Sequence, residues 1–427
     1  MHIPDGYLAP AVSLGLGALT VPAWYAATRR VQAVLSHRLV PLLAVFAALS
    51  FTIMMFNVPV PGGTTAHAVG GTLVAIVLGP WAAVIAVTTA LVIQALFFGD
   101  GGILAIFANC LNMAVVLPFV GYATYRLLAG RSPTLSPRRA WAAAIGGYAG
   151  ITAAALAVGI ELGVEPLWFS QHGHALYSPY TLQQAVPAML VSHLFGASIV
   201  EGFVTGLGVA YFQQRHPEYL AARQPARPSE AADAGDGAPR PPWQLVAGAT
   251  VATAALLAVL GLATGGGDPA RLFGTDWSQV GWPDVATMLL LVAILGAVLV
   301  PLAYRLLPPG FRRTGAAFTA LAVVAPLGLV APGFAYGEGG AEDVEAAFGY
   351  VPQGLRDLSG LFSAPLGDYN VPLPFFDGAN APLWHAALGY EITGITGILL
   401  VGGAALGLGR LLGLRRPTAP GEAGSSA

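Results

Sequence analysis

The chain carries little charge and contains no lysine. Of its 427 residues, 9% are charged and 56% are hydrophobic, and the mean hydropathy is +0.68. An ordinary soluble domain carries roughly a quarter charged residues, so this composition excludes a water-soluble globular fold. The formal net charge of -2 provides no basic field that would attract nucleic acid. The lipid bilayer is therefore the partner that the composition implies.

Further absences exclude particular chemistries. A phosphate-binding loop of the form G-x-x-x-x-G-K-[ST] requires a lysine, so any ATP hydrolysis must take place on another subunit. The single cysteine, Cys110, excludes an intrachain disulfide framework and a thiolate cluster for zinc or iron–sulfur. The sequence has no H-E-x-x-H motif, which disfavours a membrane metallopeptidase.

Long apolar runs predict an all-α polytopic membrane protein of about eleven spans. A helix needs ~20 apolar residues to cross the hydrocarbon core. The runs that meet or approach this length are residues 8–27, 39–56, 67–80, 81–98, 102–125, 140–160, 185–212, 243–264, 284–306, 315–335 and 386–409. The third and fourth runs are short and are separated only by Gly79 and Pro80. They are either two tilted spans or a broken re-entrant pair.

The distribution of arginine predicts the orientation. Basic residues collect in cytoplasmic loops. If the amino terminus is outside, only Arg271 and Arg356 of the 19 arginines fall outside, and the carboxy terminus is cytoplasmic. The first ten residues contain no Lys or Arg and lack the features of a secretory signal, so we expect them to persist in the mature protein.

A polar segment divides the chain into two modules. Residues 213–242 are rich in Pro, Ala, Asp and Arg, too poor in apolar residues to pack, and are predicted to form a cytoplasmic linker. We expect a seven-span module at residues 1–212 and a four-span module at residues 243–416 with an outside loop at residues 336–385. Residues 417–427 are predicted to be a disordered cytoplasmic tail.

Two ionisable residues lie within the seventh predicted span. His193 and Glu201 are eight residues apart on one predicted helix face, and ionisable groups in membrane helices usually face a polar interior. Their role is open between solute binding, proton relay and helix packing. The corresponding alternative function is a proton-coupled secondary transporter of a small solute.

His2 and His67 suggest a metal site at the outer face. The free amine of Met1, the amide nitrogen of His2 and Nδ1 of His2 can chelate one metal through fused five- and six-membered rings. A fourth nitrogen from His67 would complete a square, the geometry associated with Ni(II) or Cu(II). The competing interpretation is that a histidine after the initiator is incidental.

At these residues the sequence resembles the CbiM/NikM family, the membrane-embedded substrate-specific components of energy-coupling-factor importers for cobalt and nickel. The resemblance covers most of residues 1–212 and rests on MHIPDGYLAP, GGTTAHAVGGTLVAIVLGPWAAV and IQALFFGDGGILAIFANCLNMAVV. It implies that the amino terminus inserts into the helical bundle. It further implies that the amine of Met1, the amide and imidazole of His2 and the imidazole of His67 hold the metal.

The resemblance also implies supporting residues and partners. Gln94, Asp100, Asn109 and Asn112 match the family pattern, and the plausible role there is hydrogen bonding around the ligands. The implied partners are separate ATP-binding subunits and a transmembrane scaffold protein in the cell membrane. The metal is then a transported substrate, with no prosthetic group and no catalytic residue on this chain. The sequence does not distinguish nickel from cobalt as the transported metal.

The carboxy-terminal half shows a weaker resemblance. GYVPQGLRDLSGLFSAPLGDYNVPLP is similar to the PDGLE-type domain of the small auxiliary subunits CbiN and NikN, with the signature altered to PQGLR at residues 352–356. The usual auxiliary subunit has about two spans, so the eighth and ninth predicted spans are an extension. The chain is interpreted as a fused M and N component.

Overall fold

The structure is a computed structural model that describes residues 1–34, 39–60, 64–221, 282–306, 312–330, 335–376 and 383–414. Within these ranges, seven helical segments are long and apolar enough to cross a membrane: Pro10–Ala33, Pro80–Phe98, Ile106–Ala129, Pro137–Trp168, Leu182–Arg215, Val285–Leu306 and Leu383–Gly413. The predicted class, an all-α polytopic membrane protein, is confirmed. The predicted span 243–264 lies outside the described residues, so the count of eleven stays a prediction.

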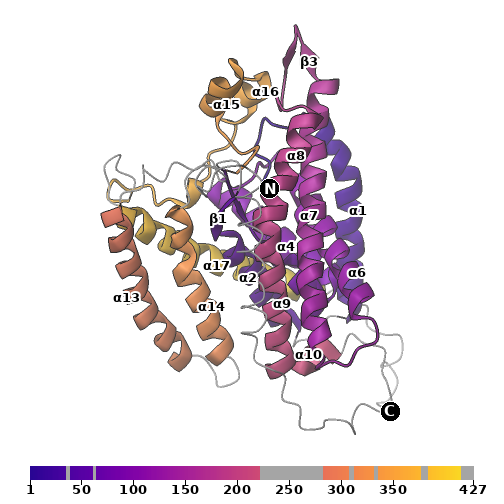
Figure 1. Ribbon diagram of the computed structural model, residues 1–427, viewed down its shortest axis with the longest axis vertical. Coiled ribbons are helices and arrows are strands. Elements are labelled where there is room, and N and C mark those ends of the chain that lie inside the picture. Colours follow the sequence, from indigo (N-terminus) through magenta and orange to yellow (C-terminus); the bar gives the residue numbers. More distant parts are fainter. Residues whose placement is uncertain are drawn as a thin grey trace, which may run out of the picture.

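The amino-terminal half is a helical bundle in which α7 is the longest member (Figure 1). Its helices are α1 (Pro10–Val34), α2 (Leu39–Met54), α3 (Gly71–Leu78), α4 (Pro80–Ile93), α5 (Ile106–Asn109), α6 (Leu117–Ala129), α7 (Pro137–Trp168), α8 (Leu182–Ser192), α9 (Ser198–Arg215) and α10 (Pro217–Ala221). Helix α7 packs along α6, α8 and α9. A Cβ on Gly150 would lie 2.6 Å from the carbonyl oxygen of Leu117, so glycine allows α7 to approach α6 closely.

Three π-helical turns lie at the ends of these helices, and two of them continue directly into a further helix. They are η1 (Gln94–Phe98) after α4, η2 (Cys110–Val116) between α5 and α6, and η3 (His193–Ala197) between α8 and α9. Such turns are rare and often lie at functional sites. Their positions matter here because Gln94, Asn112 and His193 all lie in them.

The run 67–80, expected as the third span, is not one continuous helix. Strand β2 (Thr64–His67) pairs antiparallel with β1 (Asn57–Val60), and helix α3 has only eight residues. At 1.5 Å per residue it is about 12 Å long, short of a hydrocarbon core of about 30 Å. Gly79, with φ +94°, separates α3 from α4. Helix α3 therefore does not form the expected third span by itself, whereas Pro80–Phe98 is long and apolar enough to cross a membrane. The choice between two tilted spans and a broken re-entrant pair stays a prediction.

The carboxy-terminal half contributes α13 (Trp282–Leu306), α14 (Arg312–Val324), η5 (Ala325–Val330), α15 (Ala341–Phe348), α16 (Gln353–Leu358), η6 (Gly367–Tyr369) and α17 (Leu383–Leu414). Helices α13 and α14 lie beside each other at one side of the molecule (Figure 1). Helix α17 packs along α2, and the Tyr390 hydroxyl donates to the Met55 carbonyl at 2.5 Å. The two halves therefore share an interface in the described residues.

The short helices α15 and α16 lie above the amino terminus, together with the small hairpin of β3 (Ser170–Gln171) and β4 (His174–Ala175) (Figure 1). The Leu176 carbonyl accepts a hydrogen bond from the Gly354 amide at 2.6 Å, and the Tyr350 hydroxyl accepts one from the Ala175 amide at 3.0 Å. The segment that follows α14 in sequence thus covers the end of the amino-terminal bundle where the chain begins.

Candidate metal centre

The first nine residues form an extended amino-terminal arm that lies inside the bundle. Met1 and His2 are each only 3% exposed. The Ile3 amide donates to Oδ1 of Asn109 at 2.8 Å, and Nδ2 of Asn109 donates back to the Ile3 carbonyl at 3.1 Å. The Asp5 carboxylate accepts from the amides of residues 103 and 104 at 3.1 and 2.8 Å. These contacts fix the backbone from which the terminal amine and His2 project.

His67 ends strand β2 and approaches the arm from the opposite side. Its Nδ1 contacts the Ala68 carbonyl at 3.0 Å, so this nitrogen carries the proton and Nε2 carries the free lone pair. The hairpin pairs His67 with Asn57. A strand end rather than a helix therefore presents this imidazole to the amino-terminal arm.

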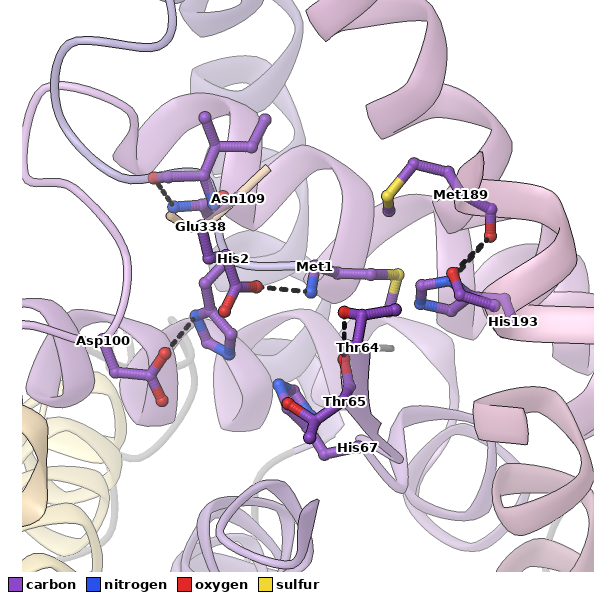
Figure 2. Close-up of polar contacts among 12 residues, drawn as sticks. Met1, His2, Thr64, Thr65, His67, Asp100, Asn109, Met189, His193 and Glu338 are labelled. Atoms are coloured by element: carbon purple, nitrogen blue, oxygen red, sulfur yellow. Dashed lines mark hydrogen bonds and ion pairs between the residues drawn. The ribbon is translucent and has the colours of Figure 1, made fainter. Parts of the chain in front are cut away.

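The two imidazoles lie next to each other with their ring planes tilted (Figure 2). The ring centroids of His2 and His67 are 5.0 Å apart, and the ring planes are tilted by 45°. Among the described residues, Nε2 of His2 and Nε2 of His67 are buried without a hydrogen-bond partner. Unpaired buried nitrogens are uncommon and often indicate an ion or ligand that they contact. A metal bound at Nε2 of His67 would satisfy that nitrogen.

Burial also sets the protonation state of His2. Burial lowers the pKa of His2 to about 3, and repulsion by the terminal amine acts in the same direction, whereas Glu338 and Asp100 oppose it. The imidazole is therefore neutral near pH 7, which is the form that binds a metal.

The orientation of the His2 ring differs from the chelate that the sequence suggests. Nδ1 of His2 lies 3.4 Å from Oδ1 of Asp100. Figure 2 marks this contact with a dashed line. Chelation by the amine, the amide and Nδ1 requires that the ring turn and that this contact be given up. The structure therefore has the donor groups together, but with the His2 ring held by Asp100.

A carboxylate from the other half of the chain contacts the terminal amine. Oε1 of Glu338 lies 2.8 Å from the nitrogen of Met1. Glu338 lies just before α15, in the predicted outside loop, and its side chain is 21% exposed. Sequence reasoning missed this residue. It is 337 positions from Met1, and no motif connects the two.

Three of the four expected supporting residues lie beside the arm or His2. Nε2 of Gln94 donates to Oδ2 of Asp100 at 3.0 Å and to the Tyr369 hydroxyl at 2.8 Å, and that hydroxyl donates to Oδ2 of Asp100 at 2.5 Å. Asn109 holds Ile3, as described above. Asn112 does not take part: its Nδ2 donates to Oε2 of Glu161 on α7 at 2.7 Å.

His193 and Glu201 are both buried, but the structure gives no interaction that joins them. Nδ1 of His193 contacts the Met189 carbonyl at 2.8 Å, and its ring points toward the Met1 side chain (Figure 2). Glu201 instead contacts the backbone that follows His67. The π-helical turn at residues 193–197 lies between them, so the helical spacing assumed from the sequence is interrupted.

In the part of the chain that the structure describes, no three His, Cys, Asp or Glu side chains are grouped as metal ligands. Two imidazoles alone make an incomplete set for a transition metal. The remaining nitrogens beside them belong to the main chain, namely the terminal amine and the His2 amide.

These features define a class: a multi-pass helical membrane protein with a buried amino terminus and two imidazoles beside it. Residues 2–219 match the model of CbiM, described as the cobalt uptake substrate-specific transmembrane region. The chain belongs to this family.

Curated relatives show that the similarity extends over the whole chain. The fused nickel transport protein NikMN of Rhodobacter capsulatus is 38% identical over 98% of this chain and 99% of its own length. The probable fused nickel transport protein LarMN of Lactiplantibacillus plantarum is 49% identical over 52% of this chain and 66% of its own. The predicted resemblance to a fused M and N component is therefore confirmed.

Among solved structures, a truncated transition metal transporter is 53% identical and covers 50% of this chain and 97% of its own. Its TM-score is 0.47.

Proposed function

We propose that this chain is the substrate-capturing membrane subunit of an ATP-driven importer for Ni(II) or Co(II). The metal is held by the amine of Met1, the amide nitrogen and imidazole of His2, and Nε2 of His67. The observation that carries the proposal is the burial of the terminal amine beside two imidazoles, together with the lack of a hydrogen-bond partner at Nε2 of His67. The nickel transport proteins named among the relatives support the choice of substrate.

Binding requires two contacts of the metal-free site to break and two nitrogens to lose protons. The His2 ring turns away from Asp100, the amine leaves Glu338, and the amine and the His2 amide lose protons to the solvent. Because protons leave as the metal binds, affinity decreases as the pH falls. Four nitrogens in a plane suit square-planar Ni(II), while family resemblance equally supports Co(II).

The proposal includes separate ATP-binding subunits and a transmembrane scaffold protein, because a chain without lysine has no phosphate-binding loop of the P-loop type. The amino terminus is outside the cell membrane and the carboxy terminus is cytoplasmic. The arginine distribution supports this orientation. Helix α10, which follows Arg215, lies at the end of the bundle opposite to α15 and α16 (Figure 1).

The site is tested by titrating Ni(II) and Co(II) into the purified full-length protein with a free amino terminus and a carboxy-terminal tag. Variants His2→Ala and His67→Ala should lose binding, as should a chain with Gly-Ser added before Met1. The control His216→Ala changes a histidine at the end of α9 and should bind normally. Normal binding by the extended chain would refute a ligand set that includes the terminal amine.

The coupling to ATP is tested separately in cells. Metal uptake should require the ATP-binding and scaffold subunits in addition to this chain. Uptake by this chain alone, driven by a proton gradient in proteoliposomes, would instead support a secondary transporter. Exposure to equal concentrations of nickel and cobalt, followed by metal analysis of the purified protein, decides which metal is preferred.

A further inference from the structure

Glu201 is a buried carboxylate that contacts backbone rather than side chains. It lies in α9 and is 0% exposed. Its Oε2 accepts hydrogen bonds from the Val69 amide at 2.8 Å and the Gly70 amide at 2.7 Å. These two amides follow His67 by two and three residues. A carboxylate that accepts two amide hydrogen bonds is held more firmly than a neutral acceptor would be.

Further hydrogen bonds hold the same short loop, residues 67–70. The Ser50 hydroxyl donates to the Val69 carbonyl at 2.7 Å, and Nδ1 of His67 contacts the Ala68 carbonyl at 3.0 Å. Gly70 has φ +74°, and a Cβ there would lie 2.6 Å from Cδ1 of Ile53. The loop therefore has little freedom to adopt another backbone conformation while these partners remain.

The Glu201 carboxyl group also lies at the amino-terminal end of α3, where it accepts from the amide of the residue that precedes the helix. Gly70 is the residue before α3 and has no side chain that could cap its amides. The amino-terminal end of a helix favours a negative charge, and capping side chains normally come from the helix itself. Here the carboxyl group comes from α9, so the loop between β2 and α3 is held by another helix.

We propose that Glu201 is a positioning residue for His67. Its carboxylate fixes the loop 67–70 so that Nε2 of His67 faces the ring of His2. This inference rests on the function proposed above and gives a role to a residue that does not contact the metal. It also separates Glu201 from His193, because the partner of Glu201 is the backbone of the ligand loop and not a second ionisable group.

The test is Ni(II) titration of full-length variants with a free amino terminus. Glu201→Ala removes the acceptor and should weaken Ni(II) binding about 10- to 100-fold, as is typical when a group that orients a ligand is lost. Glu201→Gln retains a side-chain oxygen that can accept from the two amides, and should restore most of the affinity. Glu391→Ala removes another buried glutamate, on α17, and should leave affinity unchanged.

A spectroscopic measurement distinguishes positioning from a general loss of stability. At saturating Ni(II), the visible absorption of the wild-type protein should show the single strong ligand-field band of a planar four-nitrogen site. In Glu201→Ala this band should weaken and shift as His67 is replaced by solvent, whereas Glu391→Ala should retain it. If Glu201→Ala does not fold, Glu201→Asp replaces it, because the shorter side chain keeps the carboxyl group but cannot reach both amides.

The outcomes separate the two proposals. If His2→Ala and His67→Ala bind Ni(II) normally, the proposed function fails. If these two variants lose binding but folded Glu201→Ala or Glu201→Asp keeps wild-type affinity and spectrum, only the positioning role is overturned. Weaker affinity with an altered spectrum, largely restored in Glu201→Gln, is the expected result.

Discussion

Replacing Asn109 with alanine should weaken metal binding although Asn109 is not a proposed ligand. The side chain is 1% exposed and makes two hydrogen bonds to the backbone of Ile3, at 2.8 and 3.1 Å. Each buried hydrogen bond contributes a net ~1 kcal/mol, so losing both destabilises the docked arm by about 2 kcal/mol. Part of the free energy of metal binding is then used to return the arm to its docked position. The apparent dissociation constant for the metal should therefore rise by up to about 30-fold.

The assay is calorimetric titration of Ni(II) into detergent-purified protein with a free amino terminus. Asn109→Asp keeps an acceptor for the Ile3 amide but loses the donor, and should give an intermediate affinity. Thr20→Val is the matched control, because the Thr20 hydroxyl also makes two hydrogen bonds, to Leu16 and Phe107, without touching the arm. Wild-type affinity in Asn109→Ala would show that Asn109 does not determine whether the arm is docked, and would refute this reasoning.

Three further predictions concern the cover of the site and its protonation. A Cβ at Gly354 would lie 2.6 Å from the Gly6 carbonyl oxygen. Gly354→Ala should therefore displace α16 and increase the rate of proteolysis within residues 335–376 of the metal-free protein. An unchanged cleavage rate would contradict the contact between Gly354 and Gly6. Glu338→Gln keeps the shape but removes the charge beside the terminal amine. Breaking a buried ion pair costs ~3–5 kcal/mol, and the cost is smaller at this site because the Glu338 side chain is 21% exposed. The thermal midpoint of the metal-free Glu338→Gln protein should therefore fall. The control Glu342→Gln changes an exposed glutamate and should leave the midpoint unchanged. Burial lowers the pKa of His2 to about 3, so below pH 6.5 the unfolded chain binds a proton that the folded protein does not. Stability should therefore fall by up to ~1.4 kcal/mol per pH unit on acidification, with a smaller slope in His2→Gln; equal slopes would refute the burial of a neutral imidazole.

The helices were predictable wherever a long apolar run coincides with one continuous helix. The run 284–306 corresponds to α13 (Trp282–Leu306), and the run 140–160 to the longer α7 (Pro137–Trp168). The run 67–80 gave the wrong local structure, because hydropathy records composition and not backbone hydrogen bonding. A short apolar loop followed by a helix of eight residues has the same hydropathy as part of a single span.

In the candidate site, too, some residues were predictable from the sequence and others were not. The roles proposed for Met1 and His2 rest on chemistry that is local in sequence, since an amine, an amide and an imidazole on two consecutive residues can form one chelate. Glu338 could not be predicted, because its pairing with Met1 is a tertiary contact between chain ends that no local pattern encodes. For Glu201 the sequence indicated a buried polar position, but the partner amides at residues 69 and 70 appear only once α3 is placed against α9.

A ligand at the first residue of a chain poses a physical problem, because terminal residues are usually disordered and ordering each residue costs ~1–2 kcal/mol of backbone entropy. In this arm every second residue has a partner. Ile3 and Asp5 contact the segment around residues 102–109, the Tyr7 hydroxyl donates to the carbonyl of residue 339 at 2.8 Å, and the Ala9 amide donates to a glutamate of α7 at 3.0 Å. The backbone entropy of the arm is therefore lost when the protein folds and not when the metal binds. Metal affinity is higher because this cost does not reduce the free energy of binding. Because the partners are spread over both halves of the chain, the carboxy-terminal half contributes to the order of the proposed site although none of its residues is a proposed ligand.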